Sequence, residues 1–187
     1  MKLMSELKNI SSEILNYFKD KILEIKFLNK NNIHNISVKF DLNFIPHSLG
    51  IDKIPYFSNL KKKGKILNNL INNDVTDAIF SKLSKNDINN IKQKIYGWKA
   101  IFSFIKNNKS SLEQIRISGK TKFFSHECDF CIVINGGCLV LCKQEENDNK
   151  FWCFIRSIRY LKDNNNKINF IDDIKVLSFY LIEDETK

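Results

Sequence analysis

The spacing of apolar residues changes along this chain, and the changes limit the folds that it can adopt. Over residues 5–21 apolar residues recur every three or four positions, as on one face of an amphipathic helix. Residues 23–44 alternate apolar and polar side chains around a polar turn, which predicts an antiparallel hairpin with one buried face. Helical spacing returns over 57–107, and a period of two follows from Gln114. We therefore expect an α+β fold: an N-terminal helix plus β-hairpin, a basic helical middle, and a C-terminal mixed β-sheet with flanking helices.

The two prolines of the chain bracket a short loop, which we interpret as a boundary. Pro46 and Pro55 flank Gly50, and such residues are typical of turns and connections. We expect an N-terminal helix-hairpin unit over residues 1–52. Residues 53–187 are expected to form the basic helical segment and a C-terminal mixed α/β domain.

Local signals in the second half predict its elements in more detail. Ser84 can cap a helix over Asp87–Asn107, because its hydroxyl can accept a backbone N–H of the first turn. Asn135-Gly136 is typical of a two-residue hairpin turn, in which both residues need positive φ. Phe151–Leu161 is predicted as a helix, with a strand left open by its aromatic residues. Strands are expected at Gln114–Ser118, Lys122–Phe124, Cys128–Ile134, Cys138–Lys143, Lys167–Ile171 and Lys175–Ile182.

The cysteines cluster around this hairpin. Four of the five are Cys128, Cys131, Cys138 and Cys142. Structural zinc needs ligands that converge on one point, whereas these side chains would stand off a pleated sheet. If the turn has two residues, Cys131 faces Val140, and Cys138 faces another valine. We interpret the cysteines as core residues that pack like small hydrophobes, with metal ligation as the alternative. No metal or cofactor is assigned.

Positive charge is concentrated in one stretch of the chain. Residues 53–125 carry fifteen Lys/Arg against four Asp/Glu, a balance of +11, whereas the whole chain is +9. Clustered cations attract polyanions, so nucleic acid is the expected partner. The residues predicted to contact phosphate are Lys61, Lys62, Lys63, Lys65, Arg116, Lys120, Lys122, Arg156 and Arg159. Lysine outnumbers arginine twenty-seven to three, as is typical of AT-rich genomes, so part of the excess need not be functional.

No motif assigns a catalytic residue. His34, His47 and His126 have no nucleophile or carboxylate at a recognised motif spacing, and neither G-x-S-x-G nor H-E-x-x-H occurs. We interpret His34 and His47 as surface residues, and His126 as a group that could titrate near a phosphate. A metal-dependent nuclease pattern around Asp129 fails, because Leu141 replaces its second carboxylate.

The C-terminal half resembles the catalytic domain of tRNA-splicing endonuclease subunits, which has a restriction-endonuclease-like α/β fold. The resemblance covers residues 84–183. It rests on Gly119–Phe123 leading into Asp129–Val133, on the basic segment Phe154–Lys162 in place of a family helix, and on paired strands at Ile168–Ile171 and Lys175–Ile182.

This resemblance implies a subunit without catalysis of its own. The family cleaves RNA without metal through a tyrosine, a histidine and a lysine. Val133 stands near the tyrosine position, Cys138 near the histidine position, and Lys162 alone could be retained. General acid-base catalysis needs titratable groups, which valine cannot supply.

The resulting hypothesis is an RNA-binding, non-catalytic subunit of a tRNA-splicing-like assembly. RNA is favoured over DNA, and we expect a protein partner or a homo-oligomer. The alternatives are a single-stranded DNA-binding module and a protein-docking subunit with no nucleic-acid role. No secretory signal and no run of eighteen apolar residues occurs, so we expect no membrane partner and a soluble intracellular protein of cytoplasm or nucleus.

Overall fold

The computed structural model describes residues 3–41, 43–57, 60, 64–72, 75–107, 112–119, 121–123, 126–161 and 174–185. The helices are α1 (Leu3–Phe18), α2 (Ile45–Leu49), α3 (Gly64–Asn72) and α4 (Lys85–Lys106), with 3-10 turns at Pro55–Phe57, Asp77–Phe80 and Leu112–Gln114. The strands are β1 (Lys21–Asn29), β2 (Asn32–Lys39), β3 (Ile115–Ser118), β4 (Thr121–Phe123), β5 (His126–Cys128), β6 (Phe130–Ile134), β7 (Gly137–Asn147), β8 (Lys150–Tyr160) and β9 (Lys175–Glu183). This is the α+β architecture that the sequence predicts.

Seven strands form one mixed sheet in the order β3-β6-β7-β8-β2-β1-β9, beside a separate β4-β5 ribbon. Strands β2 and β8 pair in parallel, and the other paired strands are antiparallel. The N-terminal hairpin β1-β2 therefore lies inside the sheet, between β8 and β9. The division between residues 52 and 53 stays a prediction, but the hairpin of the first part pairs with strands of the second.

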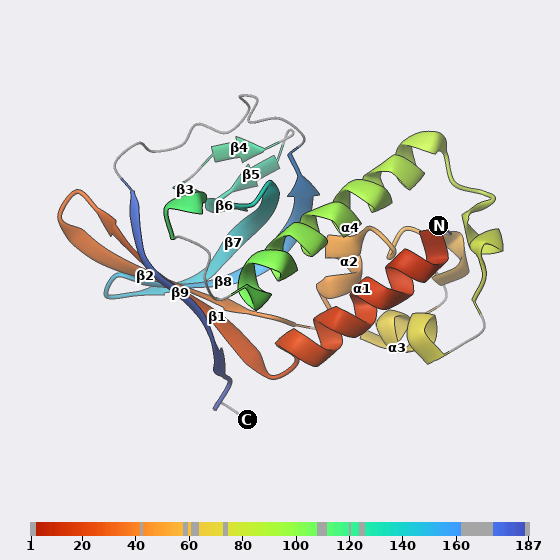
Figure 1. Cartoon of the computed structure of the whole chain (residues 1–187), viewed down its shortest axis with the longest axis horizontal. Coiled ribbons are helices and arrows are strands. Elements are labelled where there is room, and N and C mark those ends of the chain that lie inside the picture. Colours follow the sequence, from red (N-terminus) through yellow and green to blue (C-terminus); the bar gives the residue numbers. More distant parts are fainter. Residues whose placement is uncertain are drawn as a thin grey trace.

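The helices gather at one end of the sheet, where α4 runs beside α1 and packs on β7 and β8 (Figure 1). Trp98 lies at the centre of this layer and is fully buried. Its indole N–H donates to Ser48 Oγ at 3.3 Å, which fixes the short helix α2 against α4. The predicted cap of α4 is confirmed, because Ser84 Oγ accepts the backbone N–H of Asp87 at 3.1 Å.

The predicted hairpin turn is also confirmed. Asn135 and Gly136 have φ of 53° and 82°, the left-handed values that a tight two-residue turn requires. The register that follows places Cys131 opposite Val140 and Cys138 opposite Val133, as expected.

The helix predicted over Phe151–Leu161 is wrong, because this segment is strand β8. A β-bulge explains the error: Val140 pairs with Ser157 and Leu141 with Ile155, so Arg156 is an extra residue in β8. The bulge gives the buried residues of β8 a spacing of two and then three, which imitates helical periodicity. These residues are Cys153, Ile155 and Ile158. The strand expected at Lys167–Ile171 lies outside the described residues.

A basic pocket as candidate functional site

Two of the nine basic residues predicted to contact phosphate line one pocket. Arg156 and Arg159 reach it from β8. Lys65 on α3 and Arg116 on β3 are exposed and lie outside its lining. Four of the others, Lys61, Lys62, Lys63 and Lys120, fall outside the described residues, as does the side chain of Lys122.

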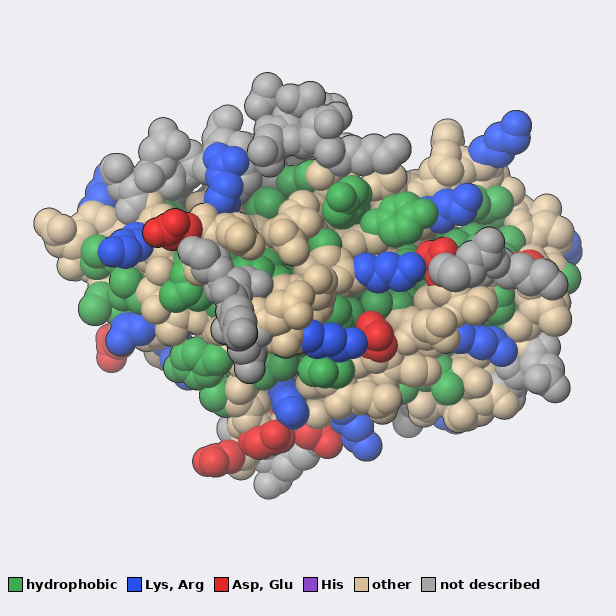
Figure 2. All heavy atoms as spheres, viewed as in Figure 1, with side chains coloured by type: hydrophobic (Ala, Val, Ile, Leu, Met, Phe, Trp, Pro, Cys, Tyr) green, Lys and Arg blue, Asp and Glu red, His purple; other side chains and the backbone are tan. Residues whose placement is uncertain are grey.

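The Lys and Arg side chains on the face drawn in Figure 2 are scattered among polar and apolar side chains and do not form one continuous patch. Part of the charge of the basic middle is paired within the chain. Lys99 Nζ lies 3.1 Å from a Glu6 carboxylate oxygen on α1, and Lys106 Nζ lies 3.1 Å from Glu13. These lysines hold two helices together.

The pocket lies beside the part of β8 that does not pair with β2. β2 pairs with β8 only as far as Phe154, and helices α2 and α4 pack against β8. Gly97 permits the close approach of α4, because a Cβ there would lie 2.6 Å from the Arg159 carbonyl oxygen and 2.7 Å from Ile158 Cγ2. A glycine on the helix thus brings the side chains of α4 beside those of β8.

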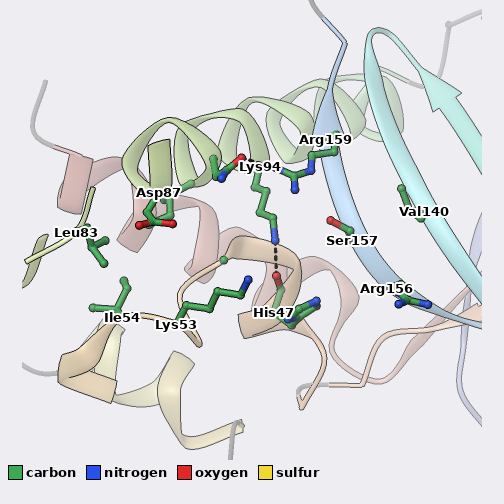
Figure 3. Close-up of a pocket in the computed structure, with 13 residues that line it drawn as sticks. His47, Lys53, Ile54, Leu83, Asp87, Lys94, Val140, Arg156, Ser157 and Arg159 are labelled. Carbon is green, nitrogen blue, oxygen red and sulfur yellow. Dashed lines mark hydrogen bonds between the residues drawn. The ribbon is translucent and has the colours of Figure 1, made fainter. Parts of the chain in front are cut away.

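The pocket has a volume of about 420 Å³ and is positively charged. Its lining includes four basic side chains, Lys53, Lys94, Arg156 and Arg159, against one carboxylate, Asp87, a balance of +3 with histidine neutral. Asp87 also caps α4 by accepting a hydrogen bond from the Ser84 hydroxyl at 2.7 Å. Figure 3 shows Lys53 and Lys94 reaching toward His47 from different elements, with Ser157 and Arg159 facing the same space. A compact anion carrying several oxygens suits such a surface.

Lys94 is the most deeply buried cation of this group. Its ammonium donates to the His47 carbonyl oxygen at 2.7 Å, and only 7% of the residue is exposed. Burial, followed by the nearby charge of Arg159, lowers the pKa of Lys94 to about 8, whereas Asp52 acts in the opposite direction. Burial also lowers the pKa of Arg159, whose guanidinium donates to Asn90 Oδ1 at 2.9 Å. Burial therefore disfavours the charged form of both side chains, and a bound anion would stabilise that form.

His47 adds an imidazole ring to the lining of the pocket. Helix α2 ends at Gly50, whose φ of 74° turns the chain so that Asp52 comes back beside His47. His47 Nδ1 lies 2.9 Å from Asp52 Oδ2, with side chains 39% and 10% exposed. The Asp52 carboxylate therefore holds the His47 ring in place from one side.

Sequence reasoning missed His47, Lys53 and Lys94. The sequence predicts His47 to be a surface residue; its side chain is 39% exposed, and it also lines the pocket. The available signal was Gly50 between His47 and Asp52, because a left-handed residue after a short helix returns the chain toward it. Nothing in the sequence pairs this loop with Lys94.

Three of the four cysteines interpreted as core residues are buried, whereas Cys142 is only partly buried. Cys128, Cys131 and Cys138 form a small apolar cluster with Val133 and Val140. Burial raises the pKa of the Cys128 thiol to about 12, and the thiols of Cys128 and Cys131 lie 3.4 Å apart. In the part of the chain that the structure describes, no group of three or more His, Cys, Asp or Glu is placed to hold a metal ion.

No family model, curated protein or solved structure matches this chain. Two positions singled out by the splicing-endonuclease resemblance, Val133 and Cys138, lie in the apolar cluster. The segment likened to the family's basic helix belongs largely to strand β8. No described helix is long and apolar enough to span a membrane.

Proposed function

We propose that this protein binds RNA by holding a backbone phosphate in the basic pocket, as a subunit of an RNA-processing assembly, with tRNA the suspected RNA. The observation that carries the proposal is the convergence of Lys53, Lys94 and Arg159 on one pocket from the α2–α3 connection, α4 and β8. Arg156 also lines the pocket, but its guanidinium donates to the Glu127 carbonyl oxygen and Cys142 Sγ. The proposal includes an intracellular location and a protein partner or second copy of the chain.

The chemistry of these cations supports a phosphate as the ligand. Arg159 presents a planar fork of N–H donors that fits two phosphate oxygens, and Lys94 supplies a buried point charge beside it. A bound phosphate would stabilise both charged forms, which burial now opposes. The exposed lysines paired with α1 carboxylates offer no such gain.

Binding can be measured by fluorescence anisotropy with labelled tRNA, single-stranded DNA and duplex DNA over a range of salt concentrations. We expect RNA to bind with a steep salt dependence, because phosphate contacts release counterions. Arg159→Met should weaken RNA binding by about tenfold to a hundredfold, as for loss of a charged hydrogen bond. Lys92→Met, which removes an exposed lysine on α4 outside the pocket lining, is the charge-matched control.

Three outcomes would overturn this proposal. Equal loss of affinity in the Lys92 and Arg159 variants would mean that binding depends on general surface charge and not on the pocket. Preference for single-stranded DNA, with quenching of Trp152 fluorescence, would favour the stacking alternative. Absence of nucleic-acid binding at low salt would leave a protein-docking role for the basic middle.

A further inference from the structure

The pocket is larger than a phosphate needs, and its two ends differ in character. Its volume of about 420 Å³ lies within the range of small-molecule sites, roughly 300–1,000 Å³, and one phosphate group takes up only a small part of it. Figure 3 shows Leu83 and Ile54 at one end, beside Asp87, and Arg159 with Ser157 at the other. A phosphate held by Arg159 therefore leaves room for a further group against the apolar end.

Helix α4 separates these two ends by about the length of one nucleotide. Asp87 and Lys94 both line the pocket and are seven residues apart, which corresponds to roughly 10 Å along a helix. Asn90 and Ile91 also line the pocket, three and four residues after Asp87, so all four side chains share one face of α4. A nucleotide whose phosphate contacts Lys94 would therefore bring its base beside Asp87.

The polar groups at this end combine acceptors with a donor. Asp87 Oδ2 accepts the Ser84 hydroxyl, and the other carboxylate oxygen has no hydrogen-bond or ion-pair partner among the described residues. A carboxylate offers only acceptors, with lone pairs left on both oxygens. The Asn90 oxygen accepts the Arg159 guanidinium, which can only donate, so the amide nitrogen is the group that Asn90 offers to a ligand.

Guanine is the base that matches this combination. Its Watson–Crick edge presents, in order, the O6 acceptor, the N1–H donor and the exocyclic amino donor. A carboxylate can accept from the two adjacent donors while an amide N–H donates to O6. Adenine and cytosine each present an amino donor beside an unprotonated ring nitrogen, and uracil places its N3–H between two carbonyl oxygens. These other bases therefore set an acceptor against the carboxylate.

We propose that the pocket takes one whole nucleotide of the bound RNA and selects guanosine. Asp87 and Asn90 contact the Watson–Crick edge of the base, which packs on Leu83. Lys94 and Arg159 hold its phosphate. The inference rests on the proposed binding of RNA in the same pocket. Because the contacted edge has to be unpaired, the selected guanosine lies in a single-stranded segment or a loop.

Anisotropy titrations with labelled single-stranded RNA test the selection. The probes are a uridine oligomer and the same oligomer with one uridine replaced by guanosine, inosine, adenosine or cytidine. We expect guanosine to raise the affinity by roughly tenfold to a hundredfold, as for one bidentate base contact. Inosine should recover only part of this gain, because it lacks the amino group. Annealing to a complementary strand should abolish the difference, because it pairs the same edge.

Variants assign the base contacts. Asp87→Asn keeps an acceptor for the Ser84 hydroxyl but presents an amide to the base, and should remove the preference for guanosine over uridine. Asn90→Asp keeps an acceptor for Arg159 but replaces the donor to O6 by an acceptor, and should reduce the same preference. Glu145→Gln removes an exposed carboxylate of β7 outside the pocket lining. It makes the same change of charge as Asp87→Asn and should leave the preference unchanged.

Free GMP tests whether the nucleotide has to belong to RNA. We expect GMP to displace the guanosine oligomer only at a much higher concentration than the unlabelled oligomer does, because GMP lacks the neighbouring phosphates. AMP at the same concentration should displace less of the oligomer than GMP.

The outcomes distinguish the two proposals. Equal affinity for all the oligomers would overturn the selection of guanosine and leave the binding of RNA intact. A preference for guanosine that persists in the Asp87→Asn variant, or that disappears in the Glu145→Gln variant, would also overturn it. Binding of GMP without binding of any oligomer would assign the pocket to a free nucleotide and overturn RNA as its ligand. Absence of binding to every probe would overturn both proposals.

Discussion

The two halves of α4 use lysine in different ways. In the C-terminal half, Lys99 and Lys106 extend to Glu6 and Glu13 on α1, and each pair remains partly exposed. In the N-terminal half, Lys94 is buried beside Arg159 and donates to a backbone carbonyl. The first arrangement neutralises charge between helices, whereas the second accumulates it. Net charge summed over a stretch of sequence cannot distinguish these arrangements, because the partner of each lysine comes from another element.

The largest effect is expected at Gly97, where α4 touches β8. Gly97→Ala should lower the free energy of unfolding by about 1–3 kcal/mol, as for overpacking, because its Cβ would meet the backbone oxygen of Arg159 at 2.6 Å. Urea denaturation would measure this. Ser103→Ala, an exposed position on the same helix, should leave stability unchanged or slightly raised. A stabilised Gly97→Ala variant would contradict the close packing that forms the pocket.

An intermediate effect of opposite sign is expected at Lys94. Lys94→Met should raise the free energy of unfolding by about 1–2 kcal/mol at pH 7, because folding buries an ammonium whose pKa falls from 10.5 to about 8. The His47 carbonyl oxygen keeps a donor, the Gly50 N–H at 3.0 Å.

The sign of this effect can be checked by measuring the free energy of unfolding of both proteins as a function of pH. Above pH 8 the folded wild-type protein already carries neutral Lys94, while the unfolded chain still binds the proton until about 10.5. The wild-type protein therefore gains stability between these values, and the advantage of the Lys94→Met variant should shrink. An advantage that grows with pH would contradict the assignment.

The smallest effect is expected at Lys99. Lys99→Met should change the free energy of unfolding by about 0–1 kcal/mol, the range for exposed ion pairs, and should leave RNA affinity unchanged. Thermal denaturation at low and high salt would measure it, since any loss should vanish as salt screens the pair. A loss of RNA affinity as large as that of the Arg159→Met variant would remove the distinction between the two halves of α4.

The sequence predicts elements wherever a local rule determines the structure. Asn135-Gly136 determines its turn and register, and Ser84 begins α4, because each depends on residues close in sequence. Strand β8 was mispredicted because the extra residue Arg156 interrupts its alternation, and a bulge depends on the neighbouring strand. The pocket is harder still to predict. His47, Lys94 and Arg159 meet only because α2 and α4 both pack on β8, which no local pattern encodes.

The placement of the hairpin β1-β2 bears on how the chain folds during synthesis. Its two outer edges pair with β8 and β9, which follow the other strands of this sheet in the sequence. Until then the nascent N-terminal segment exposes unpaired backbone donors and acceptors on both sides, a template for mispairing between chains. Contacts this distant in sequence also favour slow folding. We therefore expect the newly made chain to depend on protection of this hairpin, and the basic pocket to form only after residue 159 has left the ribosome.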